Sequence, residues 1–97
     1  MKDKSTNKFL MRVKGNSMIG ANIADGDFVL VEKSFNYLHN SIIIAAINDN
    51  WTLKQINLSE QDIKLIPANP DYEEIHILPT DKFRIVGKVE KVIRQTS

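Results

Sequence analysis

Apolar positions along this chain fall in short runs and alternations that are separated by polar turns. Phe9, Met11 and Val13 occupy alternate positions, as expected of a strand with one buried face. The same reasoning predicts a helical turn around 17–21 and seven short strands, at 9–14, 28–32, 42–47, 51–58, 63–66, 75–77 and 83–93. This regular spacing predicts an all-β fold of partly closed, twisted sheets with hairpins and at most one short helical turn.

The composition and the turn residues support this fold class. Thirteen Ile and six Val against five Ala favour pleated, half-buried surfaces over helices. Turn chemistry predicts a reversal at 25–27, with the sequence Asp-Gly-Asp, and a tight β-hairpin turn at 48–50, with the sequence Asn-Asp-Asn. Gly87, inside the last strand, predicts a bulge or a close backbone approach.

Length and charge restrict the function classes. The 97 residues suit one domain at 9–97, preceded by a flexible polar tail at 1–8. The longest apolar run, 42–47, is too short for a bilayer span of about 20 residues, and no signal peptide core follows the N-terminus. A net charge of +1 argues against a dedicated nucleic-acid binder. The absence of cysteine excludes disulfides and thiolate metal sites and fits a cytoplasmic protein.

Lys54 is the first residue whose position suggests chemistry. In the strand at 51–58 it shares a face with Thr52, Ile56 and Leu58. One interpretation is a lysine whose stem packs on apolar surface while its ammonium reaches water. The other is a desolvated lysine with a lowered pKa, which would be able to act as a general base.

A serine that such a base could activate lies in the loop 15–20, between two glycines. Glycine allows backbone amides to approach a substrate and stabilise an oxyanion. On the loop alone, however, Ser17 is better explained as a helix N-cap.

Histidine and metal chemistry receive less support. His39 lies in a polar loop and His76 on a short strand, so both are interpreted as solvated or structural residues. Their spacing from Asp25 or Asp27 does not suggest a catalytic triad, and the aspartates are explained by the turn. Two isolated histidines without cysteine make a poor metal site, and no cofactor is expected.

Four motifs together resemble the LexA and UmuD family of self-cleaving serine–lysine peptidases. They are Gly-Asn-Ser-Met at 15–18, Asp-Gly-Asp at 25–27, Trp-Thr-Leu-Lys at 51–54 and Leu-Ile-Pro-Ala-Asn-Pro at 65–70. The order and spacing of the motifs resemble the family over almost the whole chain. The resemblance looks closer to UmuD than to LexA at Ile43, Ala45, Ala46 and the Leu-Ile-Pro sequence at 65–67.

The resemblance implies a role for each matching residue. Ser17 would be the nucleophile and Lys54 its base, and the backbone amides of Asn16 and Ser17 would stabilise the oxyanion. Met18 would shape the substrate groove. The implied reaction is cleavage of a small-residue–Gly bond in an upstream arm, stimulated by a RecA filament in the response to DNA damage.

The chain departs from the family pattern because the 16 residues before Ser17 contain no Ala-Gly or Cys-Gly pair. We therefore expect either a C-terminal domain or a processed form, with any DNA contact made by a missing N-terminal domain. The alternative function is a non-catalytic dimerisation module, either a UmuD-like subunit of a translesion DNA polymerase or the oligomerising half of a phage-type repressor. A two-fold homodimer is expected in both cases, with 86–93 as the candidate contact.

Overall fold

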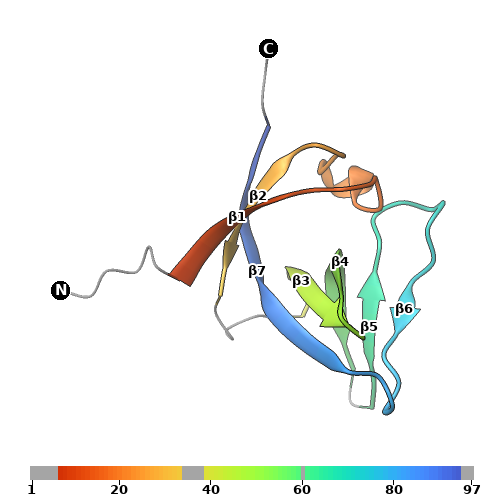
Figure 1. Cartoon of the computed structure of the whole chain (residues 1–97). Coiled ribbons are helices and arrows are strands. Elements are labelled where there is room, and N and C mark those ends of the chain that lie inside the picture. Colours follow the sequence, from red (N-terminus) through yellow and green to blue (C-terminus); the bar gives the residue numbers. More distant parts are fainter. Residues whose placement is uncertain (1–6, 34–38, 60, 95–97) are drawn as a thin grey trace.

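The computed structural model of the chain describes residues 7–33, 39–59 and 61–94 (Figure 1). It is an antiparallel β structure, and the short 3-10 turn η2 (Ile19–Ala21) follows the first strand. This confirms the all-β prediction. The strands are β1 (Lys8–Arg12), β2 (Phe28–Glu32), β3 (Ile42–Ile47), β4 (Asn50–Leu58), β5 (Ile63–Ile66), β6 (Ile75–His76) and β7 (Phe83–Ile93).

The predicted strand bounds agree closely with the structure. Four strands, β2, β3, β5 and β7, have the expected limits. β1 runs from Lys8 to Arg12 instead of 9–14, because the backbone of Val13 already bonds to Gly26 and Asp27 in the turn before β2. Residues 1–6 of the expected polar tail lie outside the described residues.

The strands form one sheet in the order β1-β2-β7-β3-β4-β5-β6. The long strand β7 joins the two halves of this sheet, since β2 pairs with its C-terminal part and β3 with its N-terminal part. Figure 1 shows β7 in blue running from the β1–β2 pair to the group of β3, β4, β5 and β6. The last strand in the sequence is therefore an interior strand of the sheet.

Two predicted local features are confirmed. Asn48 and Asp49 both have positive φ, 49° and 74°, as a two-residue hairpin turn between β3 and β4 requires. The β3–β7 register shifts between Ile44 and Ala45, next to Gly87. A Cβ on Gly87 would lie 2.6 Å from the carbonyl oxygen of Glu32, so this position is both a bulge and a close backbone approach.

Two clusters of buried apolar residues fill the molecule. One joins β1, β2 and the loop after β1, and includes Met18, Ile23, Val29, Val31, Ile44 and Leu53. The other lies between β3, β4 and β5 and includes Ile43, Ala45, Ile56 and Leu65. β4 contributes to both clusters, and Lys54 lies between Leu53 of the first and Ile56 of the second.

The strand segment 86–93, the candidate dimer contact, is not a simple sheet edge, because β7 lies between β2 and β3. β3 pairs with β7 only as far as Lys88, and Val92 and Ile93 are exposed. The dimer contact stays a prediction. Within the described residues, no helix has the length and hydrophobicity that a membrane span requires.

Candidate active site

The structure brings Ser17 and Lys54 together. Lys54 Nζ lies 3.0 Å from Ser17 Oγ, although 37 residues separate them in the sequence. Ser17 comes from the loop between β1 and η2, and Lys54 from the middle of β4. A nucleophile within hydrogen-bond distance of an amine is the geometry that proton transfer between them requires.

The environment of Lys54 favours its neutral form. The residue exposes only 8% of its surface, so the interpretation of an ammonium reaching into water is wrong. Desolvation by the surrounding protein lowers the pKa of Lys54 from its ordinary value of 10.5. Among the described residues, Lys54 forms no ion pair with a carboxylate, so no such contact opposes the lowering of its pKa.

A second hydrogen bond orients the amine. Lys54 Nζ lies 2.7 Å from Thr52 Oγ1, two positions earlier on the same face of β4. When Lys54 is neutral, it can donate an N–H to Thr52 and turn its lone pair toward the Ser17 hydroxyl. Thr52 is therefore a positioning residue. It is part of the Trp-Thr-Leu-Lys motif at 51–54, but neither composition nor spacing predicts this role.

The N-cap interpretation of Ser17 is wrong. The cap residue of η2 is Met18, and it makes no side-chain capping bond. The Ser17 hydroxyl instead points to Lys54. The first amides of η2 already have acceptors, because Ile19 donates to the carbonyl of Asn16 at 3.3 Å and Gly20 donates to the carbonyl of Ala68, so the hydroxyl is available for the lysine.

The segment after β5 holds the serine loop in place. The amide of Ala68 donates to the carbonyl of Ser17 at 2.8 Å, and the amide of Gly20 donates to the carbonyl of Ala68 at 2.6 Å. Asn69 Nδ2 donates to the carbonyl of Asn16 at 2.8 Å. A Cβ on Gly20 would lie 2.5 Å from the Ala68 carbonyl oxygen, so the close approach depends on glycine.

The Asp-Gly-Asp turn supports the same loop from the other side. The amide of Gly15 donates to Asp25 Oδ1 at 2.6 Å, and the amide of Asp25 donates to Asn16 Oδ1 at 3.1 Å. The amide of Val13 donates to the carbonyl of Asp27 at 2.7 Å. The turn therefore fixes the backbone that leads into Asn16 and the side chain of Asn16 itself.

Asp27 connects this turn to the end of β7. Its carboxylate accepts hydrogen bonds from Arg94 Nε at 3.1 Å, from Arg94 Nη2 at 2.8 Å and from the amide of Ala24 at 2.8 Å. The Arg94 guanidinium, followed by the Ala24 amide, lowers the pKa of Asp27 from its ordinary value of 3.8. Arg94 Nη2 also donates to the carbonyl of Asn22 at 2.9 Å.

A pocket of about 250 Å³ opens at the dyad. Ser17, Lys54 and Thr52 line it together with residues of β1 and the following loop. Met18 also borders this pocket, although it is 2% exposed and belongs to the core. Among the described residues, no acceptor is found for the backbone amides of Asn16 and Ser17. Asn16 is not among the residues that line this pocket, and the role of the two amides as oxyanion donors stays a prediction.

The two histidines have structural partners elsewhere. His39 Nδ1 accepts the amide of Leu58 at 3.0 Å, and His76 Nε2 lies 2.8 Å from Asp62 Oδ2. In the part of the chain that the structure describes, no group of three or more His, Asp or Glu side chains could hold a metal ion.

Sequence reasoning missed three contributors, Thr52, Ala68 and Arg94. Thr52 has a local signal, since it shares a strand face with Lys54. Ala68 acts through its backbone, and Arg94 is brought to Asp27 across 67 residues, so neither carries a signal in side-chain type or local spacing.

Comparison with known proteins agrees with this geometry. Residues 1–90 match the family model described as Peptidase S24-like. The chain is 41% identical over 86 residues to the LexA repressor of Syntrophotalea carbinolica, covering 89% of this chain and 43% of that protein. It is 35% identical over 88 residues to the LexA repressor of Delftia acidovorans, covering 91% of this chain and 39% of that protein. The LexA repressor of Stenotrophomonas maltophilia is 38% identical over 79 residues, covering 81% of this chain and 37% of that protein.

The chain thus spans about two fifths of the length of the curated relatives that it matches. The closer likeness to UmuD than to LexA stays a prediction, because the three relatives described above are all LexA repressors. The broader resemblance is confirmed by the family match over most of the sequence. The chain belongs to the Peptidase S24-like family.

Proposed function

We propose that this chain is a serine–lysine peptidase domain of a regulator of the response to DNA damage. Its reaction would be the cleavage of a small-residue–Gly bond in an arm that lies upstream of the domain. The observation that carries the proposal is the 3.0 Å contact between Ser17 Oγ and the buried amine of Lys54.

The proposed reaction begins with neutral Lys54, which takes the proton of Ser17 as the serine oxygen attacks the scissile carbonyl. The amides of Asn16 and Ser17 stabilise the oxyanion of the tetrahedral intermediate. The intermediate collapses to an acyl-serine, and Lys54 gives its proton to the departing amine. Lys54 then activates a water molecule, which hydrolyses the ester and restores the free serine.

The partners that we propose follow from the family and the name of the relatives. A domain of a LexA-like repressor would act as a cytoplasmic homodimer, be activated by a RecA filament and contact DNA through a separate N-terminal domain. The alternative is a non-catalytic dimerisation module, such as a UmuD-like subunit of a translesion DNA polymerase or the oligomerising half of a phage-type repressor.

A trans-cleavage assay tests the proposal. The domain is mixed at alkaline pH with a relative that carries its upstream arm and a serine-to-alanine change at its own nucleophile. We expect cleavage at one small-residue–Gly bond, with none by Ser17→Ala protein. Cleavage that persists in Ser17→Ala protein would contradict the proposed nucleophile.

A tethered version of the assay covers substrates too weak to bind in trans. The relative's arm is fused upstream of residue 7, and self-cleavage is followed with and without Ser17→Ala. A folded fusion that stays intact at alkaline pH would overturn the peptidase proposal and favour the dimerisation module.

A further inference from the structure

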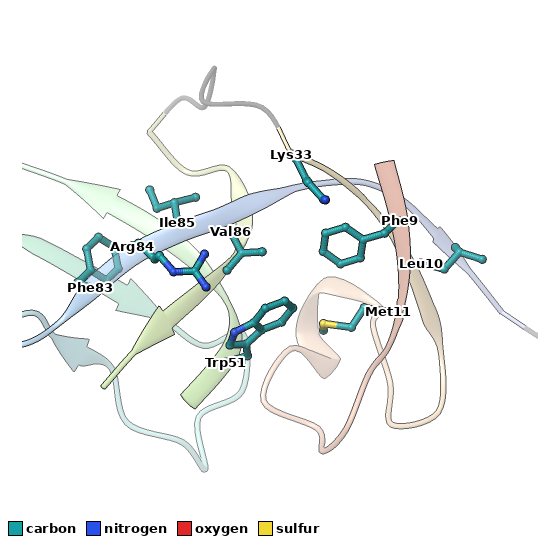
Figure 2. Close-up of a pocket in the computed structure, with 9 residues that line it drawn as sticks. All are labelled: Phe9, Leu10, Met11, Lys33, Trp51, Phe83, Arg84, Ile85 and Val86. Carbon is teal, nitrogen blue, oxygen red and sulfur yellow. The ribbon is translucent and has the colours of Figure 1, made fainter. Parts of the chain in front are cut away.

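A second, larger groove of about 900 Å³ lies beside the catalytic pocket. Figure 2 shows its lining side chains, with Phe9 and Trp51 pointing into the space between β1 and β7. Trp51 is 51% exposed, a high value for so large an apolar side chain. The lining residues are Phe9, Leu10, Met11, Lys33, Trp51 and 83–86.

The groove adjoins the catalytic pocket. Met11 on β1 and Trp51 on β4 line both hollows. Trp51 lies three positions before Lys54 on the same strand, so the groove begins a few residues from the dyad. An extended peptide whose scissile bond lies at Ser17 can therefore continue along this groove on one side of the bond.

The groove combines an aromatic wall with positive charge. The rings of Phe9 and Trp51 are 6.2 Å apart and tilted by 46°, and Lys33 Nζ lies 5.7 Å from the centre of the Phe9 ring. Lys33 and Arg84 are the charged lining residues among those described, and neither forms an ion pair with another described residue. This lining suits a peptide in which an apolar side chain is followed by a carboxylate.

The strands beside the groove can also accept an extended backbone. In the described sheet, β1 is an edge strand that pairs with β2 alone. β2 reaches β7 only from Lys88 onward, so Phe83 and the residues after it have β3 as their one strand partner in this part of the chain. A peptide strand bound here would gain main-chain hydrogen bonds as well as side-chain contacts.

We propose that this groove binds the extended flank of the peptide substrate and determines its specificity. An apolar side chain of the flank packs on Phe9 and Trp51, and an acidic side chain pairs with Arg84 and Lys33. The occupant is a peptide and not a second copy of the domain, because the groove shares Met11 and Trp51 with the catalytic pocket and carries only positive charge among its described lining residues. This inference rests on the proposed function.

Trp51 is the one tryptophan in the sequence, so its fluorescence reports directly on the groove. The probe is an unlabelled peptide with an Ala-Gly bond and a flank of about six residues, enough to span about 20 Å as a strand. The flank contains Leu and Glu, and it is placed on the amino side of the bond in one peptide and on the carboxyl side in another. Binding is titrated with Ser17→Ala protein.

We expect one of the two flanked peptides to shift the Trp51 emission to shorter wavelength and to bind at least about tenfold more tightly than a peptide without the flank. Arg84→Glu should weaken binding about tenfold, and exchanging the peptide Glu for Lys should restore it. Lys64→Glu on β5 makes the same charge change away from the groove and should leave the affinity unchanged.

Equal affinity of flanked and unflanked peptides, or no rescue by the charge exchange, would overturn the proposal. Dissociation of a dimer by Arg84→Glu, without a change in peptide affinity, would show instead that the groove joins two copies. The titration uses catalytically inactive protein, so the groove can be confirmed even if the dyad is inert. Conversely, equal cleavage rates for peptides with and without the flank would contradict the role of the groove and leave the proposed peptidase activity intact.

Discussion

Lys54 carries its amine into the interior of the protein, and its chemistry depends on the loss of a proton. We expect Lys54→Met, which keeps the volume and removes the amine, to lower cleavage by about 10²-fold to 10⁴-fold, the usual contribution of a general base. The fold should survive, because the substitution removes a desolvated polar group. Cleavage rates and urea unfolding midpoints measure both effects. A Lys54→Met protein that cleaves normally would end the role of Lys54 as base.

The pH dependence of cleavage follows from the same residue. Burial lowers the pKa of Lys54 below 10.5, so the neutral fraction, and with it the rate, should rise with pH and reach a plateau above the lowered pKa. Single-turnover rates from mildly acidic to alkaline pH measure the curve. A flat profile would contradict a titrating lysine.

Stability should depend on pH with the same sign. Because desolvation depresses the folded pKa of Lys54, burial of the neutral amine carries no charging penalty above 10.5, and the penalty grows as pH falls from 10.5 through the folded value. Wild type should therefore lose stability relative to Lys54→Met as pH falls through this window. Chemical denaturation of both proteins at several pH values measures the difference. A constant difference would show that burial does not shift the pKa.

At the scale of elements, two glycines allow close backbone approaches with different consequences. Gly20 faces the Ala68 carbonyl under the serine loop, and Gly87 faces Glu32 inside the sheet. Gly20→Ala should displace the loop that carries Ser17 and lower cleavage by about 10²-fold, because a small misplacement of a reacting group is costly. Gly87→Ala should destabilise the fold by about 1–3 kcal/mol, the usual cost of overpacking.

The two variants act as controls for each other. Cleavage rates are compared under conditions in which both proteins are fully folded, and urea unfolding gives the free energy of unfolding of each. A Gly20→Ala protein with the wild-type cleavage rate would show that the close contact between Gly20 and the Ala68 carbonyl does not position Ser17.

The contact between Arg94 and Asp27 joins the end of β7 to the Asp-Gly-Asp turn. Arg94→Ala should lower the unfolding midpoint at neutral pH, since the Asp27 carboxylate loses the guanidinium that lowers its pKa. With a depressed folded pKa, this stabilisation is present above 3.8 and disappears as pH falls through the folded value of Asp27. The wild-type advantage should therefore vanish in acid, as measured by denaturation at two pH values against Lys91→Ala. An advantage that persists there would indicate packing, not charge.

At the scale of the whole molecule, the end of β7 is the predicted dimer contact. Val92 and Ile93 are 38% and 42% exposed, beyond the last residue that pairs with β3. Val92→Arg should weaken a two-fold dimer by introducing charge into an apolar contact. Sedimentation over a range of concentrations measures the change, with Leu78→Arg, 55% exposed at another edge, as the matched control. Dissociation by Leu78→Arg alone would place the interface elsewhere.

Local features of the fold could be predicted from the sequence because their causes are local. Side chains alternate faces along a strand, so apolar alternation located the strands, and the limits of β3 and β7 agree with the structure. Asn48 and Asp49 adopt positive φ more readily than most residues, which made the hairpin recognisable. The pairing of Ser17 with Lys54 came from motif resemblance, and the structure places their side chains 3.0 Å apart.

The tertiary structure alone decided the depth of Lys54 and the supports of the serine loop. β4 contributes to both apolar clusters, so Lys54, whose ammonium could reach water on the strand pattern alone, becomes desolvated. The cap interpretation of Ser17 failed because a distant amine attracts its hydroxyl. Ala68 and Arg94 act across the chain, and β7 becomes an interior strand through pairing with β2 and β3. Such non-local contacts depend on which strands become neighbours, and residue type and local spacing do not specify this.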